Sequence, residues 1–368
     1  MQSPVYFWDL RATMKAPFDV RLRRLLKATG YGSHIESGDL AALKIHFGER
    51  GTTAFIHPIW IKPIVDFFRK SGAKPFLTDT NTLYVGQRGE SVSHAMQAAM
   101  HGFDPAVLGA PVIIADGIKS GNERAIEYPG KNFQTFYLAG DILDADLLVT
   151  LNHFKGHELA GFGGALKNLG MGCATRKGKM QQHCGMGPKV LEEKCSACGA
   201  CVNVCAPEAL SLKEGERITL DAERCVGCAA CFLACRHGGL VVDWKVEVNT
   251  FLERMIEYAA SVMTTFAKPA LHMSFLMNIT PACDCTGYSD APLCPDLGII
   301  ASMDPVALDQ AGFDLVSQAM PRAGMLPESY RAGEDKFNAI HSHVQGDYAI
   351  AYAETLGLGS RSYKLIQV

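Results

Sequence analysis

Eight cysteines between residues 195 and 235 have a spacing that suits iron–sulfur chemistry. They form two runs, at residues 195–205 and 225–235, and each run has the spacing C-x2-C-x2-C-x3-C. Three closely spaced thiolates can hold three corners of a cubic iron–sulfur cluster, while a more distant thiolate holds the fourth. Where two such clusters lie together, the last cysteine of each run binds the cluster of the other run.

This crossover assigns four thiolates to each of two predicted [4Fe–4S] clusters. The ligands would be Cys195, Cys198, Cys201 and Cys235 for one cluster, and Cys225, Cys228, Cys231 and Cys205 for the other. Paired zinc sites and disulfides are the alternatives. Two complete runs favour the clusters, because a single C-x2-C would serve zinc equally well. Small residues between the ligands would also let the backbone approach inorganic sulfide.

A second segment whose residue types could take part in catalysis or ligand binding follows a predicted strand and extends to residue 183. Open α/β sheets bind ligands at the carboxyl ends of their strands. Its glycines would let the backbone approach a ligand, and we expect this of Gly161, Gly163 and Gly164. The imidazole of His157 is the candidate for proton transfer, since it titrates near neutral pH. A glycine-rich turn with solvated basic residues is the alternative.

Basic residues in the same segment suit an anionic ligand. Lys167 would hold an anionic substrate or attach a cofactor, and Arg176, Lys177 and Lys179 would bind a carboxylate or phosphate group. The expected substrate is therefore a small anion.

Five cysteines lie outside the two runs. We interpret Cys294 as a small buried hydrophobic residue. Cys283 and Cys285 are separated by one residue in a predicted loop, which suits metal binding better than packing. We hypothesise that Cys173, Cys283 and Cys285 converge on a third metal or iron–sulfur site. The fourth position would be taken by Cys184, His183 or an exogenous ligand. A redox-active set of thiols and inert cysteines are the two alternatives.

The glycine-rich segment resembles that of a protein family, the domain-of-unknown-function family 362. Members of that family carry a similar segment beside a two-cluster ferredoxin insert, followed by Cys-Asp-Cys and Asp-Pro-Val-Ala. These two motifs stand here at residues 283–285 and 304–307, so that the resemblance covers most of residues 145–320. It implies an iron–sulfur protein and names no reaction.

A shorter stretch is similar to the nickel-pincer lactate racemases. The spacing of His157, Lys167 and His183 matches a His, Lys and His of that family. The resemblance implies a shared fold, an acid–base role for the first His, cofactor attachment by the Lys and nickel ligation by the second His. An earlier catalytic His of the family has no counterpart, and residues 79–82 lie near where it would fall.

Strand and helix patterns alternate on both sides of the cysteine runs. Helices are expected at residues 18–29, 58–69, 91–101 and 248–265 and after Asp304-Pro305. Strands are expected at residues 41–47, 75–79, 111–115, 145–151, 271–279, 297–302 and 363–368, with an edge strand at 5–8. The alternation predicts an α/β body with a mixed or parallel sheet. Its two parts would be residues 1–186 and 243–368, interrupted at 187–242 by a bacterial-type two-cluster ferredoxin module.

Composition limits the classes of partner. The chain has 368 residues, of which 48% are hydrophobic and 20% charged, and its net charge of −3 gives no electrostatic case for nucleic acid. No apolar stretch predicts a membrane span, and the first ten residues do not resemble a signal peptide. Thirteen cysteines indicate a reducing compartment, so a cytoplasmic location is expected.

Together these features predict an iron–sulfur oxidoreductase. Its two clusters would pass electrons between a redox partner protein, such as a ferredoxin, and a site in the α/β body. The alternatives are an electron-transfer subunit without its own chemistry, and a metal-dependent lyase or racemase-type enzyme.

Overall fold

The body of the protein is built on one eight-stranded sheet with the strand order β16-β1-β15-β14-β7-β2-β3-β4. The computed structural model describes residues 2–84, 86–184, 188–213, 215–225, 227, 230–241 and 247–368. The strands are β1 (Ser3–Trp8), β2 (Leu40–Ile45), β3 (Lys74–Asp79), β4 (Val112–Ile114), β7 (Leu147–His153), β14 (Leu271–Leu276), β15 (Gly298–Ser302) and β16 (Tyr363–Gln367). β15 is antiparallel to both of its neighbours, and the other neighbouring pairs are parallel. The prediction of an α/β body with a mixed or parallel sheet is therefore confirmed, and the sheet is mixed.

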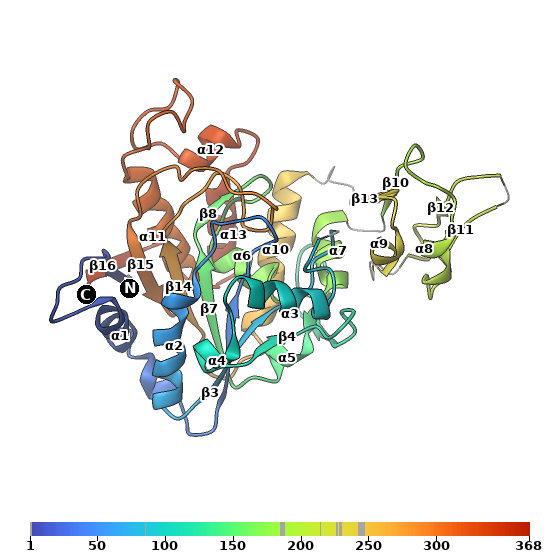
Figure 1. Cartoon of the computed structure of the whole chain (residues 1–368). Coiled ribbons are helices and arrows are strands. Elements are labelled where there is room, and N and C mark those ends of the chain that lie inside the picture. Colours follow the sequence, from blue (N-terminus) through green and yellow to red (C-terminus); the bar gives the residue numbers. More distant parts are fainter. Residues whose placement is uncertain are drawn as a thin grey trace.

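Helices cover both faces of this sheet (Figure 1). One face packs against α1 (Phe18–Ala28), α2 (Pro58–Lys70), α3 (Ser91–Met100) and α4 (Pro105–Leu108). The other face packs against α5 (Gly140–Leu143), α6 (Ala165–Gly170), α10 (Val248–Met263), α11 (Pro305–Gln318), α12 (Lys336–Ile340) and α13 (Gly346–Thr355). Along β2, Leu43 faces the first set of helices, and its neighbour Lys44 reaches Asn168 of α6.

The shorter elements complete the body. A 3-10 helix spans Tyr31–His34, and the hairpins are β5 (Glu123–Glu127) with β6 (Thr135–Ala139) and β8 (Lys155–His157) with β9 (Gly161–Gly163). Helix α7 (Arg176–Cys184) leads from the glycine-rich segment towards the cysteine runs. Within the described residues, no helix combines the length and apolar character that a membrane crossing requires.

The cysteine runs form a small, separate group of elements beside α7 (Figure 1). They are β10 (Lys189–Val190), α8 (Ala200–Asn203), β11 (Leu210–Ser211), β12 (Thr219–Leu220), α9 (Ala230–Ala234) and β13 (Leu240–Val241). β10 pairs with β13 and β11 with β12, both antiparallel. We call residues 188–241 the cysteine module.

Most expected elements are present, with ends that differ by a few residues. The helix after Asp304 begins at Pro305, and the Asp304 carboxylate accepts a hydrogen bond from the Ala307 N–H at 2.9 Å, as an N-cap should. The expected edge position of residues 5–8 is wrong, because β16 pairs outside β1 and becomes the edge. The reason is that a distant segment, invisible to local patterns, completes the sheet there.

Candidate active site

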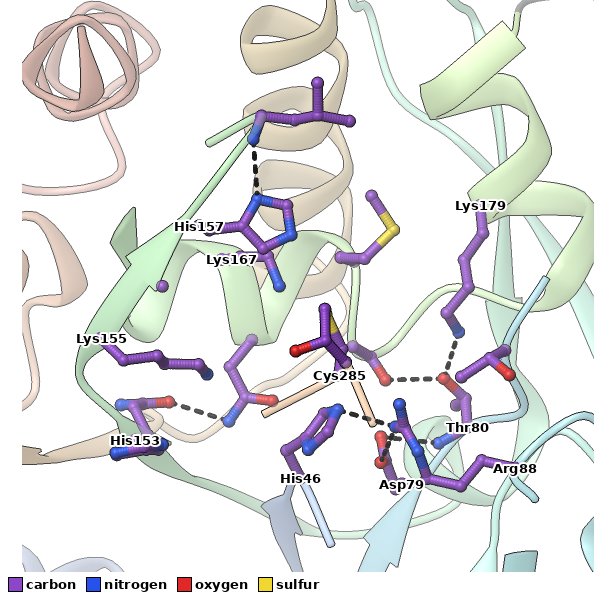
Figure 2. A pocket seen from close by; sticks show the side chains of 18 of the residues that line it. His46, Asp79, Thr80, Arg88, His153, Lys155, His157, Lys167, Lys179 and Cys285 are labelled. Atoms are coloured by element: carbon purple, nitrogen blue, oxygen red, sulfur yellow. Dashed lines mark hydrogen bonds and ion pairs between the residues drawn. The ribbon is translucent and has the colours of Figure 1, made fainter. Parts of the chain in front are cut away.

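A cavity of about 290 Å³ lies where parallel strands β2, β3 and β7 end. It is lined by the chain segments that follow these strands, by α6 and α7, and by the loop at residues 285–286. The carboxyl edge of a parallel sheet is where α/β proteins place ligands, so the position agrees with the expectation from the sequence. Figure 2 shows basic side chains from several elements pointing into this space.

The three residues predicted to be catalytic all line this cavity. His157 comes from β8, Lys167 from α6 and His183 from α7. Two of the predicted ligand-binding glycines, Gly163 and Gly164, line it as well. The structure thus brings together residues that the sequence separates by up to 26 positions, counted from residue 157 to residue 183.

Gly161 and Arg176 are not among the residues that line the cavity. Gly161 has φ +73°, and its α-carbon faces the backbone of Gly346, where a Cβ would meet atoms at 2.8 Å. It therefore serves close packing of the β8–β9 hairpin. The Arg176 side chain is buried, and its backbone N–H donates to Ser120 Oγ at 2.9 Å.

The hydrogen bonds of His157 determine which of its ring nitrogens carries the proton. Its Nδ1 accepts hydrogen bonds from the backbone N–H groups of Leu159 and Ala160, each at 3.1 Å. Nδ1 therefore carries no proton, and the neutral ring carries it on Nε2. Burial lowers the pKa of His157 well below its ordinary value, and Lys167 and Lys155 lower it further. At neutral pH, His157 is a hydrogen-bond donor through Nε2 rather than a source of imidazolium protons.

Lys167 lies beside a pair of cysteines. Its Nζ is 3.7 Å from Cys283 Sγ. A nitrogen of His157 and the Sγ atoms of Cys283 and Cys285 lie within 4.8 Å of one another, which makes them a candidate metal-binding group among the described residues. Burial would raise the pKa of Cys283, but the hydrogen bond from the Cys285 thiol and the charges of Lys167 and Lys155 bring that pKa below its ordinary value.

Cys173 is placed apart from this group. It is buried in a cluster of apolar side chains that includes Phe136 and Leu138, and its Sγ–H donates to the Asn168 carbonyl at 3.8 Å. Burial raises the pKa of Cys173 to about 11. Cys294 is also buried, as expected for a small hydrophobic residue.

Several buried charged side chains in the cavity wall were not predicted as site residues from the sequence. Lys44 Nζ lies 2.8 Å from Asp79 Oδ1. Arg88 Nη1 lies 3.7 Å from Asp79 Oδ2, and Figure 2 shows these two side chains side by side. Burial alone would raise the pKa of Asp79, but Lys44 and His94 hold it well below its usual range. The sequence feature that could have revealed them is Lys44, a lysine within an otherwise apolar strand.

A second buried carboxylate anchors the loop that carries the cysteine pair. Asp284 contacts Lys155 Nζ at 2.9 Å, His153 Nδ1 at 3.2 Å and His46 Nδ1 at 3.5 Å. It is fully buried, and its position between Cys283 and Cys285 fixes both neighbours relative to β7 and β8. The sequence motif Cys-Asp-Cys drew attention to its cysteines, whereas the aspartate makes the structural contacts.

Of the two further lysines predicted to bind anions, Lys179 lines the cavity and Lys177 does not. Lys179 Nζ donates to Thr80 Oγ1 at 2.5 Å and to the Ala174 carbonyl at 2.6 Å. Both partners are uncharged, and burial lowers the pKa of Lys179 to about 8. Lys177 instead lies over the Tyr137 ring, 3.4 Å from its centroid.

The cysteine module contains two small cavities, each lined by cysteines of both runs. One is lined by Cys195, Cys198, Cys201 and Cys235, the complete set expected for one cluster. The other is lined by Cys205, Cys225 and Cys231. The fourth ligand expected there, Cys228, lies outside the described residues. Thiolates in groups of four suit a [4Fe–4S] cluster, so the donor sets fit the predicted ligation.

Two apolar residues connect the module with the active-site cavity. Met180 of α7 is fully buried and lines the cavity of Cys205, Cys225 and Cys231. Its neighbour in the chain, Lys179, lines the active-site cavity. Leu83 lines that same cavity and packs in one hydrophobic cluster with Met180 and residues of the module.

Comparison with known proteins identifies a family rather than an activity. Two solved structures are similar, each with a TM-score of 0.40: the lactate racemase apoprotein from Thermoanaerobacterium thermosaccharolyticum and a protein from Thermotoga maritima. They are 11% and 8% identical and cover 75% and 72% of this chain, which spans only 51% and 52% of theirs. No curated protein matches the chain significantly. The profile of the family described as Domain of unknown function (DUF362) matches residues 41–314, and the chain therefore belongs to that family.

Proposed function

We propose that this protein is an iron–sulfur oxidoreductase that acts on a small anionic substrate in the cavity at the end of β2, β3 and β7. The residues that would hold two [4Fe–4S] clusters are Cys195, Cys198, Cys201 and Cys235, and Cys205, Cys225, Cys228 and Cys231. When bound, each cluster supplies the gain and release of a single electron.

One observation carries this proposal: a side chain that lines the cavity packs against a side chain that lines a cysteine cavity of the module. Met180 belongs to the wall of the cavity lined by Cys205, Cys225 and Cys231, and Leu83 belongs to the wall of the active-site cavity. The two side chains pack in the same cluster. The redox module is thus adjacent to the candidate site, which a separately functioning carrier domain would not require.

The cavity residues have distinct roles in this proposal. Among the described residues, Lys167 and Lys179 donate hydrogen bonds to a sulfur and to uncharged oxygens rather than to carboxylates, so they would bind the anionic group of the substrate. His157 would donate a hydrogen bond from Nε2 to negative charge that develops as the substrate gains electrons. Buried Asp79 and Asp284 hold Lys44 and Lys155 in place around them.

The outward face of the module suits a protein partner. Cys198 is exposed, and it lines the cavity that does not include Met180. A redox carrier such as a ferredoxin would dock at this end and exchange electrons there, while the opposite end faces the body.

Metal analysis of anaerobically purified protein tests the proposal. We expect about eight irons and about eight sulfides per chain, because each [4Fe–4S] cluster contains four of each. The variant Cys201→Ser should lose about half of the iron, since one cluster loses a ligand. The matched control Cys294→Ser, which changes a buried thiol in the body, should keep all of it.

The reduced protein should also give electron paramagnetic resonance signals of reduced clusters. Stoichiometric zinc in place of iron, in protein that never met oxygen, would contradict the proposal.

A second candidate function is a metal-dependent lyase or racemase. The observation that favours it is the presence of His157, Lys167 and His183 in one cavity, since these residues match the nickel-pincer motif in type and spacing. Nickel that remains bound in a Cys201→Ser variant and is lost from His183→Ala would favour this function over the first.

A further inference from the structure

We propose that Cys283 and Cys285 form a redox-active thiol pair, which cycles between a dithiol and an intramolecular disulfide within the active-site cavity. The inference rests on the proposed function for its source of electrons, but the thiol chemistry itself can be tested without it.

The geometry brings the two sulfurs together. Their Sγ atoms lie within 4.8 Å of each other, and the backbone N–H of Cys285 donates to Cys283 Sγ at 3.3 Å. A disulfide requires about 2.05 Å, which side-chain rotation at adjacent thiols can supply. Cys285 lines the cavity and Cys283 is buried behind it, so one sulfur faces a reactant while the other is shielded.

The loop that holds the pair is fixed on several sides. Tyr84 Oη donates to the Cys285 carbonyl at 3.0 Å, and the Glu49 N–H donates to the Asp284 carbonyl at 2.9 Å. Thr286 Oγ1 donates to the Cys283 carbonyl at 2.7 Å. These contacts restrain the backbone, so that the change between dithiol and disulfide is left to the side chains.

Metal binding is the competing reading, and the orientation of His157 argues against it. A histidine ligand binds a metal through an unprotonated nitrogen and usually donates its other N–H to an acceptor. In His157 the unprotonated nitrogen, Nδ1, is already engaged by two backbone N–H groups. Nε2 therefore carries the proton, so neither ring nitrogen is free to bind a metal ion without a change of tautomer or orientation. With Cys173 placed elsewhere, the proposed third metal would have two thiolates from the described residues, too few for a closed site.

Lys167 supplies the positive charge beside the sulfur that a metal ion would otherwise supply. Its ammonium group lies 3.7 Å from Cys283 Sγ and stabilises the thiolate form of that sulfur. Reduction of the disulfide then balances simply: the S–S bond breaks, two electrons and one proton are taken up, and a Cys283 thiolate and a Cys285 thiol result. The proton enters at Cys285 from the cavity, and the two electrons come one at a time from the iron–sulfur module. Oxidation by a two-electron acceptor in the cavity reverses these changes.

Thiol labelling of the anaerobic holoprotein tests the inference. A Cys294→Ser background removes the third cysteine from the same stretch of chain. The protein is equilibrated with mixtures of oxidised and reduced dithiothreitol, quenched in acid and alkylated. The mass of the peptide that contains residues 283 and 285 is then measured by mass spectrometry. We expect two alkyl groups under reducing conditions and none under oxidising conditions, with the unlabelled peptide lighter by two hydrogens than the dithiol. Cys283→Ser should abolish the protected form.

Two results would overturn the inference. One is full alkylation of both cysteines at every dithiothreitol ratio in folded protein. The other is a metal ion beyond the cluster irons that is bound stoichiometrically, blocks alkylation and is lost in Cys283→Ser.

The experiment distinguishes failure of the proposed function from failure of the thiol pair. If dithiothreitol reduces the disulfide but dithionite-reduced holoprotein leaves it intact, the thiol pair stands and electron delivery from the module is refuted. If the clusters are present and reducible but no disulfide forms, the proposed function stands and the thiol pair is refuted.

Discussion

At the scale of single residues, the body of this protein buries a row of polar side chains on one face of its sheet. Thr150, Asn152, His272 and Ser274 face each other on β7 and β14, and Lys44 continues the row on β2. Thr150 Oγ1 lies 2.8 Å from His272 Nδ1, and Asn152 Nδ2 donates to the Met273 carbonyl at 3.0 Å. Hydrogen bonds between these groups offset the free energy lost when they leave water.

His272 gives this row a measurable dependence on pH. Burial lowers the pKa of His272 to about 3, whereas an unfolded histidine has a pKa near 6.5. As pH falls below about 6.5, the histidine becomes protonated in the unfolded state but not in the folded state. The free energy of unfolding therefore decreases. We expect wild-type protein to lose about 2 kcal/mol more unfolding free energy than His272→Gln between pH 7 and pH 5. Urea denaturation at the two pH values measures the difference. His343→Gln, at an exposed position, is the control and should follow the wild type.

At the scale of elements, α6 positions Lys167 in the candidate site by packing closely on α10. The α-carbon of Gly170 leaves no room for a side chain, because a Cβ there would lie 2.0 Å from the Met255 carbonyl oxygen. The other end of α6 is held by Asp309 of α11, whose carboxylate accepts from the N–H groups of Ala165 and Leu166 at 2.7 and 2.9 Å. Lys167 projects from the helix fixed at these two ends.

Gly170→Ala should therefore push α6 away from α10. We expect a loss of about 1–3 kcal/mol in unfolding free energy, as for other insertions of a methyl group into a packed interior. Chemical denaturation measures this loss. Gly121→Ala is the matched control, since nothing lies within 4 Å of a Cβ at that position and its loss should stay within about 0.5 kcal/mol. Equal stability of the two variants would show that α6 and α10 can separate without cost.

Sequence patterns anticipated these elements better than they anticipated the site. Alternating strands and helices were recognised because apolar residues dominate β2, β3 and β7, and caps such as Asp304 mark helix starts. His157, Lys167 and His183 were found because they share one glycine-rich segment. Asp79 and Asp284 were not, since they meet Lys44 and Lys155 only after segments far apart in the chain fold together. The local periodicity of apolar residues carries no information on contacts between residues that are distant in the sequence.

At the scale of the whole molecule, Met180 is the main hydrophobic contact that α7 makes with the cysteine module. Met180→Ala should remove packing worth about 2–5 kcal/mol at a fully buried position. We expect faster hydrogen–deuterium exchange in β11, β12 and α8, with exchange in α10 unchanged. Met320→Ala changes a methionine that is 81% exposed and should leave exchange in the module as it is. Unchanged exchange in both variants would mean that the module does not depend on α7.

The pairing of β10 with β13 has a consequence for how such a chain could arise. Lys189 lies opposite Val241, and Val190 opposite Leu240, so the polypeptide leaves the cysteine module beside the place where it entered. An excursion with adjoining ends disturbs its host little, and genes tolerate insertions of this kind more readily than others. Replacing residues 189–241 with a tight turn should therefore leave the eight-stranded sheet of the body intact.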